Sequence, residues 1–499
     1  MTLFGTAGIR GPVEDVSPSL ALSVGQAAGE PGETVVVGRD GRETGPALAA
    51  AMEAGLESAG ADVRRVGQVP TPALAFASQG RRGVMLTASH NPPEDNGIKL
   101  FADGVEYDSD AERIIDDRVA SDDSRLARWD QWGDAEGLSV LDQYWSAVET
   151  YVREQFGGQT QDGEQSSASE PLEGLRIAVD CGNGVGALAT PQILERLGGT
   201  VVAVNASVDG HFPGRGSKPT PETLSEFTDF LAEGSEARRA LNHASSAERS
   251  SADRRAAEPR DGGETASVDF DLGLAHDGDA DRLVVLGPDG EIIHEDTVLA
   301  VVAAHYTAAS DVGDPVVVTT PNASARIDER VRAAGGRVER VRLGALHEGV
   351  ARERAAGTDD TEIVFAAEPW KHIHTAFGGW IDGVASAAVV AALVADAGAT
   401  DRLREPVTER PYRKVSVECP DAAKVDTMAA LETDLPETFP DATVNTDYGV
   451  RLEFEDASWL LVRPSGTEPY VRLYAESESV DELVAEARTV IETAVERSR

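Results

Sequence analysis

Cysteine, lysine and long apolar runs are all scarce in this 499-residue chain. Its two cysteines, Cys181 and Cys419, lie far apart and lack the spacing of metal ligands. This excludes a disulfide framework and predicts a reducing, cytoplasmic location. No run reaches the roughly 18 apolar residues of a membrane span, the longest candidate being Val384 to Val394, and the opening MTLFGTAGIRG has no signal-peptide hydrophobic region. We therefore expect no membrane association.

The charge of the chain is strongly one-sided. It has 45 Lys and Arg residues against 87 Asp and Glu, a formal net charge of −42. Only five of the basic residues are lysines: Lys99, Lys218, Lys371, Lys414 and Lys424. Such a balance excludes nucleic acid and anionic membranes as default partners. It favours a protein adapted to concentrated salt, where a Debye length of about 3 Å at 1 M screens self-repulsion; an acidic chain that binds cations or basic partners is the alternative.

Three stretches of the sequence resemble copies of one unit. The runs TVVVGRD, LRIAVDCGNG and PVVVTTPN begin at Thr34, Leu175 and Pro315, so their starts are 141 and 140 residues apart. Each run leads into a turn, a helical pattern and a second Val-rich run, beginning near Ala59, Leu197 and Ala334. Strand, helix and strand in this order predict βαβ units in buried mixed or parallel sheets covered by helices.

The remaining segments differ from these copies. From Lys414 onward the pattern predicts strands around a helix at Lys424 to Leu431, then a terminal helix with apolar residues near a 3.6 period, which is typical of a small α+β domain. The ranges 157–170 and 233–267 are too polar to bury a core, so we expect a linker and a disordered surface insertion there, with functional disorder as the alternative.

Two motifs carry the groups for phosphoryl chemistry. TASHNPPEDNGIKL, from Thr87 to Leu100, places Ser89 where a strand gives way to a turn, so Ser89 could be a covalent nucleophile; an ordinary polar strand end is the alternative. DGDADR places carboxylates at Asp277, Asp279 and Asp281, an oxygen set that suits Mg²⁺ or Ca²⁺. An EF-hand is excluded because its sixth and twelfth positions here are Arg282 and Pro288, and a solvated acidic turn remains the alternative.

Two further motifs favour phosphate and sugar binding. RPSGTEPYVR offers forked donors and a close-approaching backbone, which indicate a phosphate cradle, with a plain turn as the alternative; the residues are Arg463, Ser465, Gly466, Thr467 and Arg472. AAEPWKHIHTAFGGWIDG crowds Glu368, Trp370 and His372 together with Lys371 and His374, which suits a polar ligand, although a surface loop would show the same density.

The four motifs together indicate phosphoryl transfer on a phosphorylated polyol. Taken in chain order, they resemble the motifs of the α-D-phosphohexomutase family of phosphoglucomutases, phosphomannomutases and phosphoglucosamine mutases. The excess of acidic residues and the scarcity of lysine further indicate a haloarchaeal source. The similarity covers nearly the whole chain through FGTAGIRG, VGRDGRETG, TASHNP, DGDADR, DYG and RPSGTEP. It implies three related mixed-sheet α/β domains and a smaller C-terminal α+β domain around a central cleft. We expect these at 1–156, 157–294, 295–404 and 405–499.

The resemblance also implies a mechanism. Ser89 would be phosphorylated and, with the three loop aspartates, would bind Mg²⁺. It would exchange its phosphoryl group with a sugar phosphate through a bisphosphorylated intermediate. Positive charge would come from Lys99, Arg10 and Arg282, and the proton carriers would be among Lys99, His90, Arg10 and His372. The loop from Arg463 to Arg472 would bind the phosphate that is not reacting.

One departure from the family pattern affects the substrate. Where the family usually has Gly-Glu-x-Ser-Gly, this chain has Glu368 followed by Pro369, Trp370 and Lys371. We expect interconversion of glucose or mannose 1- and 6-phosphates. The alternatives are a phosphoglucosamine or phosphopentose mutase, a non-catalytic phosphosugar-binding paralogue, or a metal-dependent phosphatase. The sequence leaves the oligomeric state open.

Overall fold

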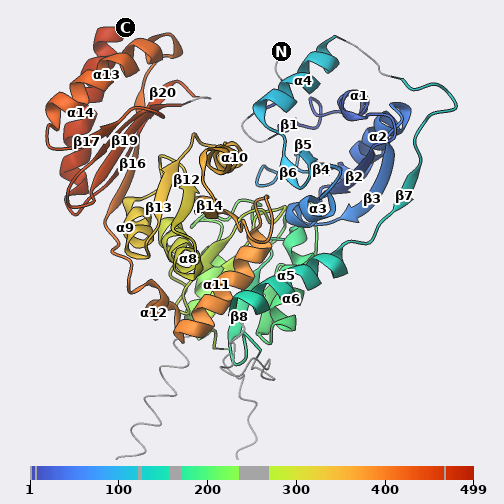
Figure 1. Cartoon of the computed structure of the whole chain (residues 1–499), viewed down its shortest axis with the longest axis horizontal. Coiled ribbons are helices and arrows are strands. Elements are labelled where there is room, and N and C mark those ends of the chain that lie inside the picture. The colour runs from blue at the N-terminus through green and yellow to red at the C-terminus, as the bar shows by residue number, and fades with distance from the viewer. Residues whose placement is uncertain (1–2, 6–7, 122–125, 157–169, 235–268, 466–467) are drawn as a thin grey trace, which may run out of the picture. The chain divides into compact units, whose positions relative to one another are not determined.

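The computed structural model describes residues 3–5, 8–121, 126–156, 170–234, 269–465 and 468–499 (Figure 1). Nearly all of the expected linker and insertion, together with Gly466 and Thr467, lie outside the described residues. The chain forms two compact units: Met1–Glu295 with Trp370–Leu403, and Asp296–Pro369 with Arg404–Arg499. The four expected domain ranges are finer than this division and stay predictions.

The first unit contains a seven-stranded sheet in the order β1-β5-β4-β2-β3-β7, with β6 paired to β5. β2 runs parallel to β3 and β4, whereas β4, β5 and β1 pair antiparallel. The strands are β1 (Ile9–Pro12), β2 (Thr34–Arg39), β3 (Asp62–Gln68), β4 (Arg82–Leu86), β5 (Asp95–Ala102), β6 (Val105–Glu106) and β7 (Ala135–Gly137).

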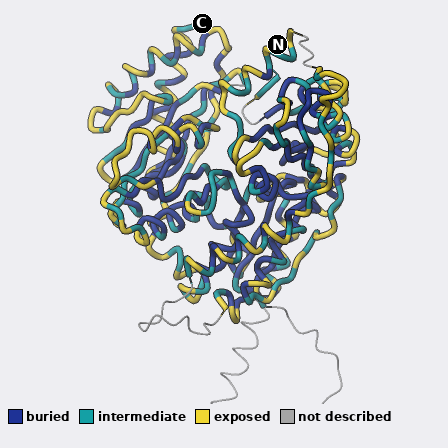
Figure 2. Tube along the Cα trace, turned by 45° about the vertical axis from the view of Figure 1, so that its right-hand side comes forward, coloured by how far each residue is buried: buried dark blue, intermediate teal, exposed yellow. Residues whose placement is uncertain are grey.

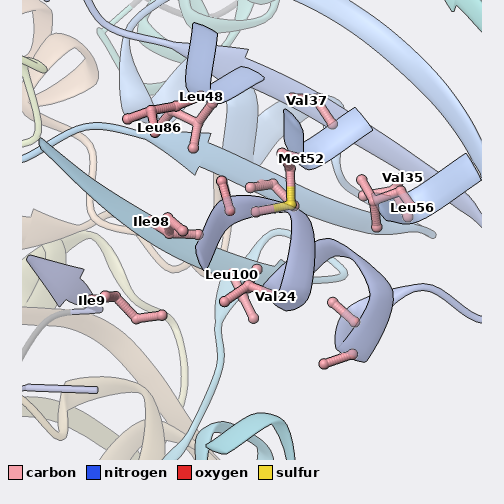
Figure 3. Packing of buried hydrophobic residues seen from close by; sticks show 14 of the residues in the cluster. Ile9, Val24, Val35, Val37, Leu48, Met52, Leu56, Leu86, Ile98 and Leu100 are labelled. Atoms are coloured by element: carbon pink, nitrogen blue, oxygen red, sulfur yellow. The ribbon is translucent and has the colours of Figure 1, made fainter. Parts of the chain in front are cut away.

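Helices cover this sheet because its central strands are apolar on both faces. The helices of this part are α1 (Pro18–Ala28), α2 (Gly45–Ser58), α3 (Thr71–Ala77), α4 (Ser109–Ala120) and α5 (Leu141–Phe156). Figure 3 shows the core between α1, α2 and the sheet, where Val24 and Met52 face Val35, Ile98 and Leu100. This core fixes the strand ends from which the loops of the candidate site project.

A second sheet in the same unit has the order β11-β10-β8-β9. β8 is parallel to β9 and β10, and β11 is antiparallel to β10. Its elements are β8 (Arg176–Asp180), η1 (Val185–Leu188), α6 (Thr190–Arg196), β9 (Thr200–Val204), β10 (Leu272–Ala275) and β11 (Val284–Leu286). β15 (Lys371–Ile373) and α11 (Gly383–Ala397) also belong to this unit, and α12 (Thr400–Arg404) follows them.

The second unit contains a parallel arrangement in which β12 lies between β13 and β14. Its elements are α8 (Glu295–Ala309), β12 (Asp314–Thr319), α9 (Ala325–Ala333), β13 (Arg337–Arg340), α10 (Leu346–Ala356) and β14 (Thr361–Glu368). Ser324 caps α9 by accepting a hydrogen bond from the Arg326 amide, so the helix begins directly after the turn that ends β12.

The C-terminal part of the second unit is an antiparallel sheet in the order β16-β20-β19-β18-β17. Its elements are β16 (Tyr412–Glu418), η2 (Asp421–Ala423), α13 (Lys424–Thr438), β17 (Thr443–Asn445), β18 (Val450–Glu453), β19 (Trp459–Pro464), β20 (Tyr470–Glu476) and α14 (Val480–Ser498). The apolar faces of α13 and α14 pack on the sheet, with Leu431, Leu435 and Ile491 fully buried. In each unit the buried stretches run through the interior (Figure 2).

The repeated pattern in the sequence is confirmed as three βαβ units. In each one the first Val-rich run pairs in parallel with the second, as β2 with β3, β8 with β9 and β12 with β13. The fold class is therefore confirmed: three α/β sheets followed by a smaller C-terminal domain of strands and helices. Among the described residues, none of the helices has the length and apolar character needed to cross a bilayer.

Candidate active site

Ser89 lies in the loop after β4 with its side chain fully buried. Its φ is +53°, in the left-handed region that non-glycine residues rarely adopt. The hydroxyl Oγ donates to Asp277 Oδ2 at 2.8 Å, and His90 Nδ1 lies 3.4 Å from Oγ. Gly278 makes this approach possible, because a Cβ at that position would lie 2.6 Å from the Ser89 carbonyl oxygen. The two motifs, 188 residues apart in sequence, are therefore in direct contact.

The three aspartates follow β10 in a tight loop, in which Ala280 has a φ of +58°. One carboxylate oxygen from each of Asp277, Asp279 and Asp281 lies within 4.8 Å of the others, and all three side chains are buried. Asp279 Oδ1 and Asp281 Oδ1 have no hydrogen-bond partner among the described residues. Buried oxygen ligands with open lone pairs fit a hard divalent cation such as Mg²⁺.

The aspartates have different proton affinities. Burial, followed by the charges of Asp281 and Asp279, raises the pKa of Asp277 to about 7. Burial would also raise the pKa of Asp281, but Lys371, Lys99 and Arg282 hold that pKa well below its ordinary value. The loop thus combines a carboxyl group that is partly protonated at neutral pH, Asp277, with one that is ionised, Asp281.

Four cationic side chains are associated with this loop. Lys99 on β5 is buried, and its Nζ lies 2.9 Å from Asp281 Oδ2 and 3.5 Å from Asp279 Oδ2. Lys371 Nζ lies 3.6 Å from Asp281 Oδ2, and Arg282 Nε lies 3.7 Å from Asp277 Oδ2. Arg10 on β1 has buried Nε and Nη2 atoms with no hydrogen-bond partner among the described residues. Donors left open in this way suit a phosphate group.

His90 and Lys99 are in opposite protonation states at neutral pH. Burial and the neighbouring charges of Arg282 and Arg10 lower the pKa of His90 to about 2, so its imidazole is neutral. Burial works against the charge of Lys99, but Asp281, Glu106 and Asp279 raise its pKa above the ordinary value. Lys99 is therefore a permanent cation, whereas the imidazole of His90 is neutral and only weakly basic.

The expected sugar-binding loop is divided along the chain, because Pro369 ends a segment of the second unit and Trp370 begins a segment of the first. Trp370, with a φ of +69°, accepts a hydrogen bond through its carbonyl from the Leu283 amide at 3.0 Å, and its side chain packs partly buried on the core of the second sheet. His372 is buried with Nδ1 3.1 Å from Ser386 Oγ. Glu368, in the other unit, accepts a hydrogen bond from the Gly344 amide.

The C-terminal loop motif contains two arginines in a cross-strand pair. Arg463 on β19 lies directly opposite Arg472 on β20. Like charges in such a pair destabilise a sheet, and the Nε atoms of both arginines are buried without a hydrogen-bond partner among the described residues. Lys424 Nζ donates at 2.6 Å to the carbonyls of Ser465 and Glu468, which flank the undescribed residues of the motif. The pair is suited to an anion.

Sequence reasoning missed several residues of these sites. Arg42 and Arg215 support the Ser89 and aspartate loops, and Lys424 supports the C-terminal loop. Lys371 was expected only in the sugar-binding loop, and its contact with Asp281 was not foreseen. One signal could have found the two lysines: the chain has only five lysines, and Lys99, Lys371 and Lys424 are three of them.

Comparison with known proteins agrees with this arrangement. Three family models match the chain: phosphoglucomutase/phosphomannomutase alpha/beta/alpha domain I over residues 1–126, domain II over 160–290, and the C-terminal domain over 414–493. A phosphopentomutase from Thermococcus kodakarensis is 36% identical over 96% of this chain and 94% of its own length. A probable phosphoglucosamine mutase from Methanopyrus kandleri is 37% identical over 99% of both chains.

A solved structure extends the comparison to the fold. The phosphoglucomutase/phosphomannomutase family protein of Burkholderia thailandensis matches with a TM-score of 0.77 and 25% identity, over 100% of this chain and 97% of that one. The buried aspartate triad fits the metal site of this superfamily. The chain belongs to the α-D-phosphohexomutase superfamily and is an isomerase of the intramolecular phosphotransferase type.

Proposed function

We propose that this enzyme moves a phosphoryl group between two positions of a sugar phosphate by way of a phosphorylated Ser89. The observation that carries the proposal is the 2.8 Å hydrogen bond from Ser89 Oγ to Asp277, which joins the nucleophile to the carboxylate triad. A serine in a strained turn, in contact with acidic oxygens and surrounded by cations, suits a site that holds and releases a phosphoryl group.

In the proposed reaction the phosphoserine P–Oγ bond breaks while a sugar hydroxyl oxygen bonds to phosphorus. The hydroxyl proton leaves with a base in the site, and Ser89 Oγ regains a proton. His90 is placed to exchange the serine proton because its Nδ1 lies 3.4 Å from Oγ. Burial, Arg282 and Arg10 make its imidazole a weak base, so this role requires the negative charge of the bound phosphoryl group to offset those cations. The second half of the cycle reverses these steps with the other phosphate of the bisphosphorylated sugar.

The charged side chains of the site stabilise this transfer. Lys99, Arg282 and Arg10 supply positive charge for the equatorial oxygens of the phosphoryl group, and Arg463 with Arg472 binds the phosphate that is not reacting. Asp277, Asp279 and Asp281, with Ser89, would hold Mg²⁺. When bound, Mg²⁺ supplies charge stabilisation to the transferring group.

For the substrate, we propose glucosamine phosphate, with pentose phosphate as the second candidate. The relatives named above are a probable phosphoglucosamine mutase and a phosphopentomutase. They favour these two substrates over the glucose and mannose phosphates expected from the sequence. The sugar loop also has Lys371 where the Gly-Glu-x-Ser-Gly pattern ends in glycine, and Lys371 contacts Asp281.

A panel of sugar 1-phosphates tests the proposal. Initial rates for glucosamine, ribose, glucose and mannose 1-phosphates would be measured with Mg²⁺ in about 2 M KCl, a salt level chosen for the acidic chain. We expect the highest kcat/KM for glucosamine 1-phosphate and a loss of at least about 10³-fold in Ser89→Ala, since the covalent step is then impossible. Undiminished turnover in Ser89→Ala would refute the phosphoserine route, and stoichiometric release of inorganic phosphate would indicate a phosphatase.

The matched variant for substrate choice is Lys371→Gly. It restores the small residue of the usual loop and leaves the three aspartates in place. We expect it to change the ranking of sugars in the panel while the phosphorylation of Ser89 persists. An unchanged ranking would show that Lys371 does not select the sugar.

A further inference from the structure

Arg42 is fully buried behind the Ser89 loop, where it contacts the backbone of that loop at four points. Its guanidinium donates to the carbonyl oxygens of Ser89 at 3.0 Å, Asn91 at 2.8 Å, Pro92 at 2.5 Å and Asp95 at 2.8 Å. A planar guanidinium presents its donors in a fixed fork. One side chain therefore determines the path of the chain from β4 to β5.

Asp40 holds Arg42 in place and connects it back to Ser89. Asp40 Oδ2 accepts from Arg42 Nε at 3.0 Å and from Thr87 Oγ1 at 2.7 Å, and Thr87 Oγ1 accepts from the Ser89 amide at 2.8 Å. The carbonyl and the amide of Ser89 are thus both bound by one buried network. Such a network can hold Ser89 at a φ of +53°, a conformation that costs about 1–2 kcal/mol on its own.

The second copy of the βαβ unit repeats this arrangement at the metal loop. Asp180, the last residue of β8, accepts from Arg215 Nε at 2.6 Å, and Arg215 Nη2 donates to the His276 carbonyl at 2.6 Å. His276 directly precedes Asp277. A side chain at Gly182 would lie 2.7 Å from the Arg215 guanidinium, so glycine leaves room for it.

Stability alone does not explain two such pairs. A buried ion pair contributes little compared with well-packed apolar residues, yet both arginines donate to the backbone of a loop that carries a reacting group. Displacement of a reacting group by about 1 Å can cost 10²-fold in rate. We propose that Asp40–Arg42 and Asp180–Arg215 are positioning pairs that set Ser89 and the aspartate loop for phosphoryl transfer, an inference that rests on the proposed phosphoserine.

Two variants of the full-length chain test the first pair. Arg42→Lys keeps the charge, but one ammonium cannot reach Asp40 and four carbonyls. Thr87→Val is nearly isosteric and removes the hydroxyl between Asp40 and the Ser89 amide. In each we expect kcat to fall about 10- to 100-fold with KM changed less than about threefold. We also expect slower phosphorylation of Ser89 by the bisphosphorylated sugar, followed by intact mass.

Arg326→Lys is the matched control. Arg326 is equally buried and pairs with Glu476 at 3.1 Å in the second unit. We expect this variant to lower the melting temperature and to leave kcat unchanged. If Arg42→Lys does not fold, kcat and the phosphorylation rate of Thr87→Val alone test the positioning role of the first pair.

Three results would overturn the inference. The first is wild-type kcat and phosphorylation rate in the folded Arg42 and Thr87 variants, and the second is an equal loss of kcat in Arg326→Lys. If Ser89 is phosphorylated in the wild-type chain, either of these two results would overturn the positioning role but would not contradict the proposed phosphoserine route. The third is wild-type protein that carries no phosphate on Ser89 after exposure to the bisphosphorylated sugar, which would overturn the proposed function as well.

Discussion

Replacing Asp279 with asparagine should stabilise the metal-free protein. Asp279 lies within 4.8 Å of two other buried carboxylates, and at an effective dielectric constant of 20 each repulsion is at least about 3.5 kcal/mol. At pH 8.5, above the pKa of about 7 of Asp277, that carboxyl group is ionised, and the variant removes two such repulsions. It also removes the attraction of Lys99 at 3.5 Å, about 5 kcal/mol on the same scale. The difference favours Asp279→Asn by about 2 kcal/mol, and the asparagine oxygen can still accept from the Thr71 hydroxyl.

The same substitution should abolish stabilisation by Mg²⁺. A ligand at 100 times its dissociation constant stabilises a protein by about 2.7 kcal/mol, and about 2–4 °C accompanies each kcal/mol in domains of 150–250 residues. Thermal unfolding at pH 8.5 in EDTA and in Mg²⁺ should therefore show a gain of about 4–8 °C for Asp279→Asn without metal and a metal-induced rise only for the wild type.

Asp289→Asn, a substitution of an exposed aspartate eight residues after Asp281, is the control for that experiment and should behave as the wild type. A lower melting temperature for Asp279→Asn in EDTA would refute the reasoning, as would an equal Mg²⁺ shift in Asp279→Asn and the wild type.

Three further predictions concern other parts of the molecule. Cys181 and Cys419 are buried, and burial raises the pKa of Cys181 to about 12, so a thiol reagent at pH 8 should label neither until denaturant is added. Asp328→Asn should cost about 2 kcal/mol at pH 7, because Asp328 binds Arg340 through both carboxylate oxygens at 2.7 and 2.9 Å. Burial opposes ionisation of Asp328, but Arg340 outweighs burial and lowers the pKa of this carboxyl group. The pair therefore stabilises the fold at neutral pH, and this contribution is lost as the pH falls through the folded-state pKa. An acid titration in which the unfolding free energies of Asp328→Asn and the wild type fall with the same slope would contradict this prediction. Lys424→Met should raise KM for the sugar phosphate about tenfold with a smaller change in kcat, since in the proposed mechanism the loop that Lys424 holds binds the phosphate that is not reacting; an unchanged KM would contradict that role.

Much of the fold could be predicted from the sequence because its strands are continuous Val-rich runs with clear turn signals. The runs beginning at Thr34, Leu175 and Pro315 became β2, β8 and β12, each paired in parallel with the next strand. The helix predicted at Lys424 to Leu431 extends to Thr438 in the structure. Its last turn contains Pro436, which the helix accommodates. β17 was not predicted, because its three residues are exposed and carry no periodic pattern.

In the candidate site, too, features formed by neighbouring residues could be predicted, and contacts between residues distant in sequence could not. Motifs that offer reactive groups within a few residues, such as the three aspartates, are visible in sequence. Contacts that cross the chain are not: Ser89 meets Asp277 across 188 residues, and Arg215 reaches His276 across 61. Trp370 was predicted as a sugar-binding residue, which stays a prediction, and the structure shows in addition that part of its side chain packs on the core of the second sheet. Spacing along the chain contains no information about such packing.

Transfer of the Ser89 phosphoryl group tests the central claim most directly. Protein carrying ³²P on Ser89 would be mixed with an equimolar unlabelled sugar monophosphate in Mg²⁺ and quenched within one turnover. The account predicts that label leaves the protein and appears first in a bisphosphorylated sugar, then in the product monophosphate. Label that stays on the protein while product forms, or that appears only as inorganic phosphate, would contradict it.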